Sequence, residues 1–194
     1  MWAWGLQRVV DYLVTDSDID ARRIAVTGLS RLGKAALLAA AFDERIALVI
    51  PHQSCLGGVA PTRTRNQSPT ALTAKKENTN HPHFFSLIFH RFNDQVDRLP
   101  FDQDSLVALV APRPVLVTAG VDDKIDDPPG AFAVLKAADR VYRFLGVEGL
   151  SVTEPVFRAT VGKRLAYHLS GGGHGIDPPY WRVFTEFSDR YMKQ

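Results

Sequence analysis

Short apolar segments that alternate with helical segments constrain the fold of this 194-residue chain more than any other feature. Four such segments are expected to form strands, and they cover residues 24–26, 46–50, 115–118 and 165–169. They lack the apolar–polar alternation of a strand with one wet face, so they indicate strands that are buried on both faces. The sequence therefore predicts an α/β fold in which helices cover both faces of a mostly parallel sheet.

The segments between these strands have the composition and periodicity of helices. In the opening segment, Trp2, Leu6, Val9, Val10 and Leu13 recur at helical spacing. Further helices are expected at residues 31–42, 104–110, 130–145 and 179–192. The polar stretch 57–83 is expected to be an irregular loop, and a loop of that length inside a compact domain usually serves a function.

Three residues suited to nucleophilic catalysis follow strand ends: Ser30, Asp123 and His174. Right-handed crossovers bring the carboxyl ends of parallel strands to one edge of the sheet, so these residues are expected to lie near one another. Their order along the chain (serine, acid, histidine) is that of the α/β-hydrolase fold. His174 stands among glycines in Ser-Gly-Gly-Gly-His-Gly, a loop flexible enough to turn its imidazole inward. The pattern predicts Ser30 as nucleophile and His174 as general base.

The glycine-containing segment around Ser30 admits three motifs. Gly28, Gly33 and Lys34 fit a phosphate-binding loop, but Ala35 replaces the hydroxyl that would hold magnesium. The dinucleotide fingerprint of short-chain dehydrogenases opens with a similar Thr-Gly-x-Ser-Arg, but the loop here is one glycine and one residue short, and no Tyr-x-x-x-Lys pair follows. A nucleophile elbow fits the strand–turn–helix order, although its second glycine stands three residues after the serine instead of two. A fourth, purely structural interpretation makes Ser30 the N-cap of the following helix.

The segment Gly28-Leu29-Ser30-Arg31-Leu32-Gly33-Lys34 resembles the Gly-Cys-Ser-Arg-x-Gly-Lys elbow of glucuronoyl esterases, the fifteenth family of carbohydrate esterases. The resemblance spans essentially the whole chain and takes in the opening Trp-Ala-Trp-Gly, Asp43-Glu44-Arg45, Gly57-Gly58, Leu99-Pro100-Phe101-Asp102, Ala111-Pro112-Arg113-Pro114, Asp127-Pro128, Val141-Tyr142 and Gly173-His174. It implies an α/β-hydrolase fold and cleavage of esters between glucuronate on xylan and lignin alcohols. It also implies that neither a metal nor a cofactor takes part.

The resemblance assigns roles to individual residues. Ser30 would attack the ester carbonyl, and His174 would take its proton and pass it to the leaving alcohol. Arg31 would direct its guanidinium at the developing oxyanion, and Lys34 would meet sugar hydroxyls.

Two departures from the family pattern change what is expected of the site. Many members carry a glutamate where this chain has Gln53, and an amide cannot stabilise imidazolium by charge. Some bacterial relatives carry an Asp after the next strand instead, and the register of Asp127-Pro128 in that resemblance implies Asp123 rather than Asp122 as the acid. Ile125 stands where a tryptophan packs on the uronate, so we expect a serine esterase for plant-polysaccharide-type esters with weak recognition of glucuronate. An acetyl xylan esterase, another esterase of this fold, a catalytically silent fragment and a carbohydrate-binding protein stay open as alternatives.

Composition excludes several other classes. The formal charge of +2 gives no electrostatic case for nucleic-acid or membrane binding, and no run approaches the ~20 apolar residues of a membrane span. A single cysteine, Cys55, excludes an intramolecular disulfide and is expected to be a buried or incidental thiol rather than a nucleophile. His81, His83 and His90 are expected to be structural rather than metal ligands. The opening sequence lacks the features of a signal peptide, while the family resemblance implies a secreted or periplasmic intact protein.

The position of the expected nucleophile strand, first along this chain, bears on domain organisation. Sheets of α/β-hydrolases have several strands before that one, so residues 1–194 are expected to form the C-terminal part of a single catalytic domain. The strand at 24–26 or a neighbour would then present an unpaired edge. We expect self-association through that edge.

Overall fold

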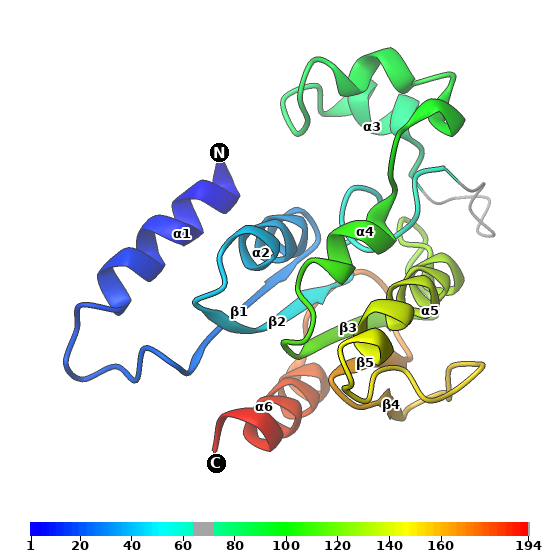
Figure 1. The fold of residues 1–194 in the computed structure, drawn as a ribbon. Helices are drawn as coiled ribbons and strands as arrows, with labels where there is room; N and C mark the ends of the chain where they lie inside the picture. Colours follow the sequence, from blue (N-terminus) through cyan, green and yellow to red (C-terminus); the bar gives the residue numbers. More distant parts are fainter. Residues whose placement is uncertain (64–71, 194) are drawn as a thin grey trace.

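The structure is a computed structural model that describes residues 1–63 and 72–193. Its centre is a five-stranded sheet with the strand order β1-β2-β3-β5-β4 (Figure 1). Four strands run parallel: β1 (Ile24–Leu29), β2 (Ile46–His52), β3 (Val115–Gly120) and β5 (Leu165–Ser170). The predicted mostly parallel α/β sheet is therefore confirmed, and the carboxyl ends of its parallel strands lie at one edge.

Helices cover both faces of the sheet, as predicted. The helices α1 (Trp2–Leu13), α2 (Arg31–Phe42), α4 (Gln103–Ala108) and α5 (Pro128–Phe144) contribute to one core, and α6 (Pro178–Met192) forms the other. Figure 1 shows α6 on the opposite side of the sheet from α2 and α4. Neighbouring residues of one strand serve different cores: Val49 of β2 packs with the first group, and Leu48 and Ile50 pack with α6. Full burial of such side chains contributes roughly 1.5–3 kcal/mol each.

The helix that follows Ser30 has the predicted bounds, and its composition explains its close packing. Its sequence is rich in alanine, the strongest helix former, and Ala36, Ala39 and Ala40 are completely buried. Small side chains on the buried face let α2 lie close against β1 and β2. The first turn of α2 is thereby held firmly at the sheet edge where the predicted site residues gather.

Two local predictions are wrong. The sheet has a fifth strand, β4 (Thr160–Gly162), which pairs antiparallel with β5 and is only half-buried, so its three residues give no apolar run. The stretch 57–83 is not wholly irregular, because it contains the polar helix α3 (Ala74–Asn80), capped by the Thr73 side chain. Residues 64–71 of that stretch lie outside the described residues. Two 3-10 turns, η1 (Phe89–Phe92) and η2 (Val96–Arg98), follow before α4.

The remaining elements differ from the predicted ones at their ends. The strands β1, β2 and β3 continue two or three residues beyond the apolar runs, toward the edge where the predicted site residues lie. Within the two described ranges, no helix is both long and apolar enough to cross a bilayer.

Candidate active site

Ser30 occupies a sharp turn between β1 and α2. Its backbone angles, φ 58° and ψ −123°, lie in a region that residues with a side chain rarely adopt. Its main-chain N–H donates to the carbonyl oxygen of His52 at 3.0 Å, which fixes the turn against the end of β2. Strain of this kind persists only where the surrounding structure holds it, and it is typical of a nucleophile elbow. The N-cap alternative loses support, because the Ser30 side chain makes no capping hydrogen bond.

The two glycines that flank the serine are both required by packing. A Cβ atom at Gly28 would lie 2.5 Å from the carbonyl group of Leu32. A Cβ atom at Gly33 would lie 2.8 Å from the carbonyl oxygen of Gly28 and 3.0 Å from that of His52. The second glycine therefore stands three residues after Ser30, because that position of α2 faces the ends of β1 and β2.

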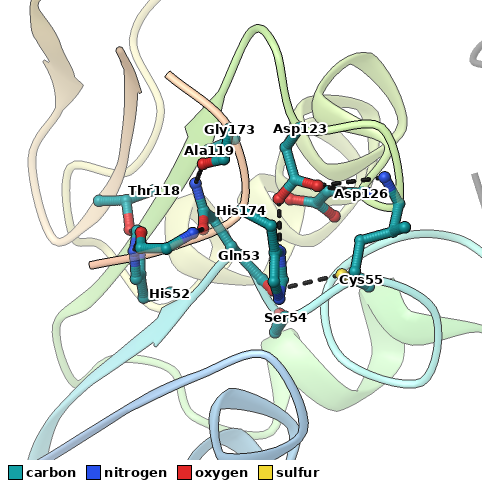
Figure 2. Close-up of polar contacts among 12 residues, drawn as sticks. His52, Gln53, Ser54, Cys55, Thr118, Ala119, Asp123, Asp126, Gly173 and His174 are labelled. Carbon is teal, nitrogen blue, oxygen red and sulfur yellow. Dashed lines mark hydrogen bonds and ion pairs between the residues drawn. The ribbon is translucent and has the colours of Figure 1, made fainter. Parts of the chain in front are cut away.

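His174 and Asp123 are joined by a hydrogen bond across the sheet edge (Figure 2). Nδ1 of His174 lies 2.7 Å from Oδ2 of Asp123. The Asp123 side chain is fully buried, whereas that of His174 is 25% exposed. The other carboxylate oxygen of Asp123 accepts from the main-chain N–H groups of Ile125 and Asp126. Because an ionised carboxylate can only accept, we assign the proton of this contact to Nδ1 of His174, which leaves Nε2 as the basic nitrogen.

Two opposing effects determine the pKa of Asp123. Burial disfavours its charged form and raises the pKa, while the hydrogen bond from His174 and those from the Ile125 and Asp126 N–H groups lower it. The hydrogen bonds prevail, so the pKa of Asp123 lies below its ordinary value. The carboxylate is therefore charged at neutral pH, as an acid that stabilises imidazolium must be.

Asp122 faces a different part of the same loop. Its Oδ2 atom accepts from the N–H of Gly172 at 3.2 Å, and its own N–H donates to the Gly172 carbonyl at 3.1 Å. The structure thus places the two consecutive aspartates in separate positions, with Asp123 on the imidazole and Asp122 on the main chain.

The serine and the histidine are linked through His52 at the end of β2. The His52 carbonyl accepts from the Ser30 N–H, and the His52 ring Nε2 lies 2.8 Å from the carbonyl oxygen of Gly175, next to His174. In the described part of the chain, the Ser30 hydroxyl forms no hydrogen bond with His174. Catalytic hydrogen bonds are often long without substrate.

Three further residues expected at the site lie as follows. Arg31 is exposed, with its guanidinium carbon 5.7 Å from the centre of the Trp2 ring. Nζ of Lys34 points inward and donates to the carbonyl oxygen of Ser54 at 2.7 Å, and desolvation lowers the pKa of Lys34. Ile125 is 36% exposed, and its N–H supports Asp123.

Several residues near the site were not assigned a role from the sequence. His52 and Gln53 are fully buried at the end of β2 and bind the loop that carries His174. Asp126 and Glu77 are also buried carboxyl groups, and burial raises the pKa of Asp126 to about 6. For His52 and Gln53 the available signal was the polar sequence that directly follows the apolar run 46–50, since such residues fall at the carboxyl edge of the sheet.

The remaining cysteine and histidine side chains have structural surroundings. Cys55 is buried, and burial raises the pKa of its thiol far above the range of a nucleophile. His81 stacks on Phe84, and Nε2 of His90 lies 3.3 Å from the Pro82 carbonyl oxygen. In residues 1–63 and 72–193, no three His, Cys, Asp or Glu side chains are placed to hold a metal ion.

A mostly parallel sheet with helices on both faces and a strained serine between strand and helix defines the α/β-hydrolase class. Comparison with known proteins gives the family. Residues 1–146 match the family model described as "Glucuronyl esterase, fungi", which is most of the chain. The chain belongs to the glucuronoyl esterase family, as the residues around Ser30 indicated.

Individual relatives agree with this assignment. The chain is 44% identical over 192 residues to carbohydrate esterase MZ0003 from an unknown prokaryotic organism. The match takes in 98% of this chain and 44% of that protein. It is 41% identical over 154 residues to the 4-O-methyl-glucuronoyl methylesterase of Hypocrea jecorina, in a match that takes in 75% of this chain and 33% of that protein. The chain thus spans less than half the length of these relatives.

Solved structures give the same fold. A promiscuous CE15 esterase from a marine bacterial metagenome superposes with a TM-score of 0.94 at 44% identity, over 98% of this chain and 47% of that one. The glucuronoyl esterase from Solibacter usitatus gives a TM-score of 0.89 at 36% identity, over 97% of this chain and 47% of that one.

Proposed function

We propose that this chain carries the catalytic residues of a serine carboxylic-ester hydrolase, with Ser30 as nucleophile, His174 as general base and Asp123 as the acid. The 2.7 Å contact between His174 and Asp123 carries the proposal, because it supplies the orientation that a general base requires. The strained Ser30 turn and the membership of the glucuronoyl esterase family support it.

In the proposed reaction, Nε2 of His174 takes the Ser30 proton as the oxygen attacks the ester carbonyl. The resulting imidazolium is stabilised by the ionised Asp123. Main-chain N–H groups at the start of α2 and the Arg31 guanidinium would stabilise the oxyanion. Imidazolium then protonates the departing alcohol, and the same base activates the water that hydrolyses the acyl-serine. The residues named supply the whole proton transfer, and the family implies neither metal nor cofactor.

The proposed substrate is an ester on a plant-wall polysaccharide. The curated relatives include methylesterases named for 4-O-methyl-glucuronoyl esters, and a structural relative is named a promiscuous esterase. Ile125, beside the catalytic acid, favours small or alkyl esters over those that need an aromatic platform for a uronate. An acetyl xylan esterase activity is therefore the second candidate. Since such polysaccharides lie outside the cell, we place the intact protein in a secreted or periplasmic compartment.

The experiment is hydrolysis of p-nitrophenyl acetate by the chain, with Ser30→Ala as the control. Labelling with a fluorophosphonate, located by mass spectrometry, identifies the reactive serine independently of turnover. Release of nitrophenol that Ser30→Ala abolishes, with the label on Ser30, supports the proposal. Turnover or labelling that survives in Ser30→Ala contradicts it, and binding of xylan fragments without turnover favours the carbohydrate-binding alternative.

A further inference from the structure

Strand β2 ends at His52, and the side chains of His52 and of the next residue, Gln53, are polar and fully buried. An unpaired buried polar group costs roughly 1–3 kcal/mol, so both side chains need partners. Both find them in the loop that carries His174. Nε2 of Gln53 donates to the carbonyl oxygen of Gly173 at 3.0 Å, and its Oε1 accepts from the N–H of Gly175 at 2.7 Å.

The two partners of Gln53 belong to the two peptide groups that flank His174, and Figure 2 shows the contact with Gly173. The Gly173 carbonyl lies in the peptide plane before His174, and the Gly175 N–H lies in the plane after it. Because the backbone has two soft torsions per residue, fixing both planes fixes φ and ψ of His174. One side chain thereby sets the direction in which the His174 Cα–Cβ bond points.

The loop itself offers little to hold that direction. Glycines surround His174 and restrict the backbone less than any other residue, and Gly172 has a φ of 97°. Support comes from the sheet edge. Nε2 of His52 binds the Gly175 carbonyl oxygen, while its Nδ1 lies 2.6 Å from the Thr118 hydroxyl. A Cβ atom at Gly120 would lie 2.5 Å from the Gly172 carbonyl oxygen and 3.0 Å from Nε2 of Gln53, so β3 also approaches the loop closely.

We propose that Gln53 is a positioning residue for His174. Its amide holds both flanking peptide groups, so that the imidazole keeps Nδ1 on Asp123 and presents Nε2 toward Ser30. An amide suits this task because it offers one donor and one acceptor side by side. A carboxylate at this position would offer acceptors only, with an oxygen opposite the Gly173 carbonyl. The backbone of Gln53, with a φ of 41°, is itself held in an uncommon conformation at this point. The inference rests on the proposed function.

The test compares Gln53→Met with the parent chain. Methionine has a similar length and volume and forms neither hydrogen bond. Gln53→Asn is the second variant, since it keeps a polar amide but is one methylene too short to reach both peptide groups. Gln103→Met at the start of α4 is the matched control. Each is measured for kcat and KM on p-nitrophenyl acetate, and for the low-field proton NMR resonance of His174 Nδ1–H.

We expect both Gln53 variants to lose kcat by about 10²-fold, the cost of misplacing a catalytic group by ~1 Å, with KM within about threefold of the parent. The Nδ1–H resonance should broaden or disappear, because the Nδ1–H group is no longer held in its hydrogen bond to Asp123. Gln103→Met should leave kcat, KM and the Nδ1–H resonance unchanged.

A folded Gln53→Met that keeps the parental kcat and resonance would overturn the proposal. Lost kcat with an unchanged resonance would also overturn it, since the imidazole would then have stayed on Asp123. If Gln53→Met does not fold, the same criteria apply to Gln53→Asn. If the parent shows no turnover, the proposed function fails, and the resonance alone decides: its loss in the Gln53 variants supports the positioning role, and its retention refutes it.

Discussion

The imidazole of His174 reaches the carboxylate of Asp123 at 2.7 Å, although the two residues are 51 positions apart in the chain. Their strands make this contact possible. β3 and β5 are parallel neighbours that end opposite each other at Gly120 and Ser170. Each residue stands three or four positions beyond its strand, so short loops suffice to bring the imidazole and the carboxylate together.

This geometry separates the roles of two consecutive aspartates. We expect Asp123→Asn to lower kcat by about 10²–10⁴-fold, because an amide carries no charge and can present an N–H to Nδ1, which favours the wrong tautomer. Asp122→Asn is the matched control, and its kcat should stay within a few-fold of the parent. Steady-state hydrolysis of p-nitrophenyl acetate measures both. Greater damage from Asp122→Asn would show that the loop contact, not the imidazole contact, matters.

The nucleophile and base should act as a unit. Ser30→Ala and His174→Ala are each expected to lower kcat by about 10³-fold or more, and the double variant should lose little beyond either single one. The reason is that removing either residue abolishes the same attack step. Additive losses in the double variant, or near-parental kcat in a single one, would be inconsistent with a shared step.

Much of this architecture could be predicted from the sequence because it depends on local patterns. The apolar run before Ser30 and the alanine-rich helix after it identify the turn, and packing shows why Gly33 stands where it does. Elements without an apolar pattern, such as α3 and β4, were missed. The contacts of Gln53 could not be predicted either, since they join residues 120 and 122 positions apart and depend on how the His174 loop turns.

Asp126 predicts a pH dependence of stability. Burial raises its pKa to about 6, from an ordinary value of 3.8. The folded state therefore binds more protons than the unfolded state between these values, and the stabilising effect of protonation is lost as the pH rises through about 6. Two pKa units correspond to about 3 kcal/mol. Between pH 4 and pH 8, the free energy of unfolding of Asp126→Asn should therefore rise by up to that amount relative to that of the parent.

Urea unfolding of the parent and of Asp126→Asn across this pH range measures the difference between their free energies of unfolding. Asp122→Asn, at an exposed position, serves as the control for the replacement of an aspartate by asparagine. A flat difference for Asp126→Asn would mean that folding does not raise the pKa of the Asp126 carboxyl.

We expect substrate preference to depend on Ile125. We expect methyl glucuronate esters to be poor substrates compared with acetyl or simple alkyl esters, because an aliphatic side chain offers no flat aromatic surface for a uronate ring. The ratio of kcat/KM for the two ester classes is the measurement, and Ile125→Trp should shift it toward glucuronate. A kcat/KM for glucuronate esters at or above ~10⁴ M⁻¹s⁻¹ in the parent, an ordinary value for an enzyme on its substrate, would contradict this preference.

The last prediction concerns the free edge of β1. Among the described strands β1 pairs only with β2, so the N–H and C=O groups on its other side have no strand partner, and Ala25 and Thr27 are exposed on it. Such an edge is a template for pairing with another chain. We expect the 1–194 polypeptide to self-associate, and Ala25→Lys to shift it toward monomer by adding charge beside the edge. Light scattering over a concentration series measures the state, with Ala137→Lys on the exposed face of α5 as the matched control. A parent that stays monomeric at all concentrations, or an equal effect of both lysines, would show that this edge does not mediate association.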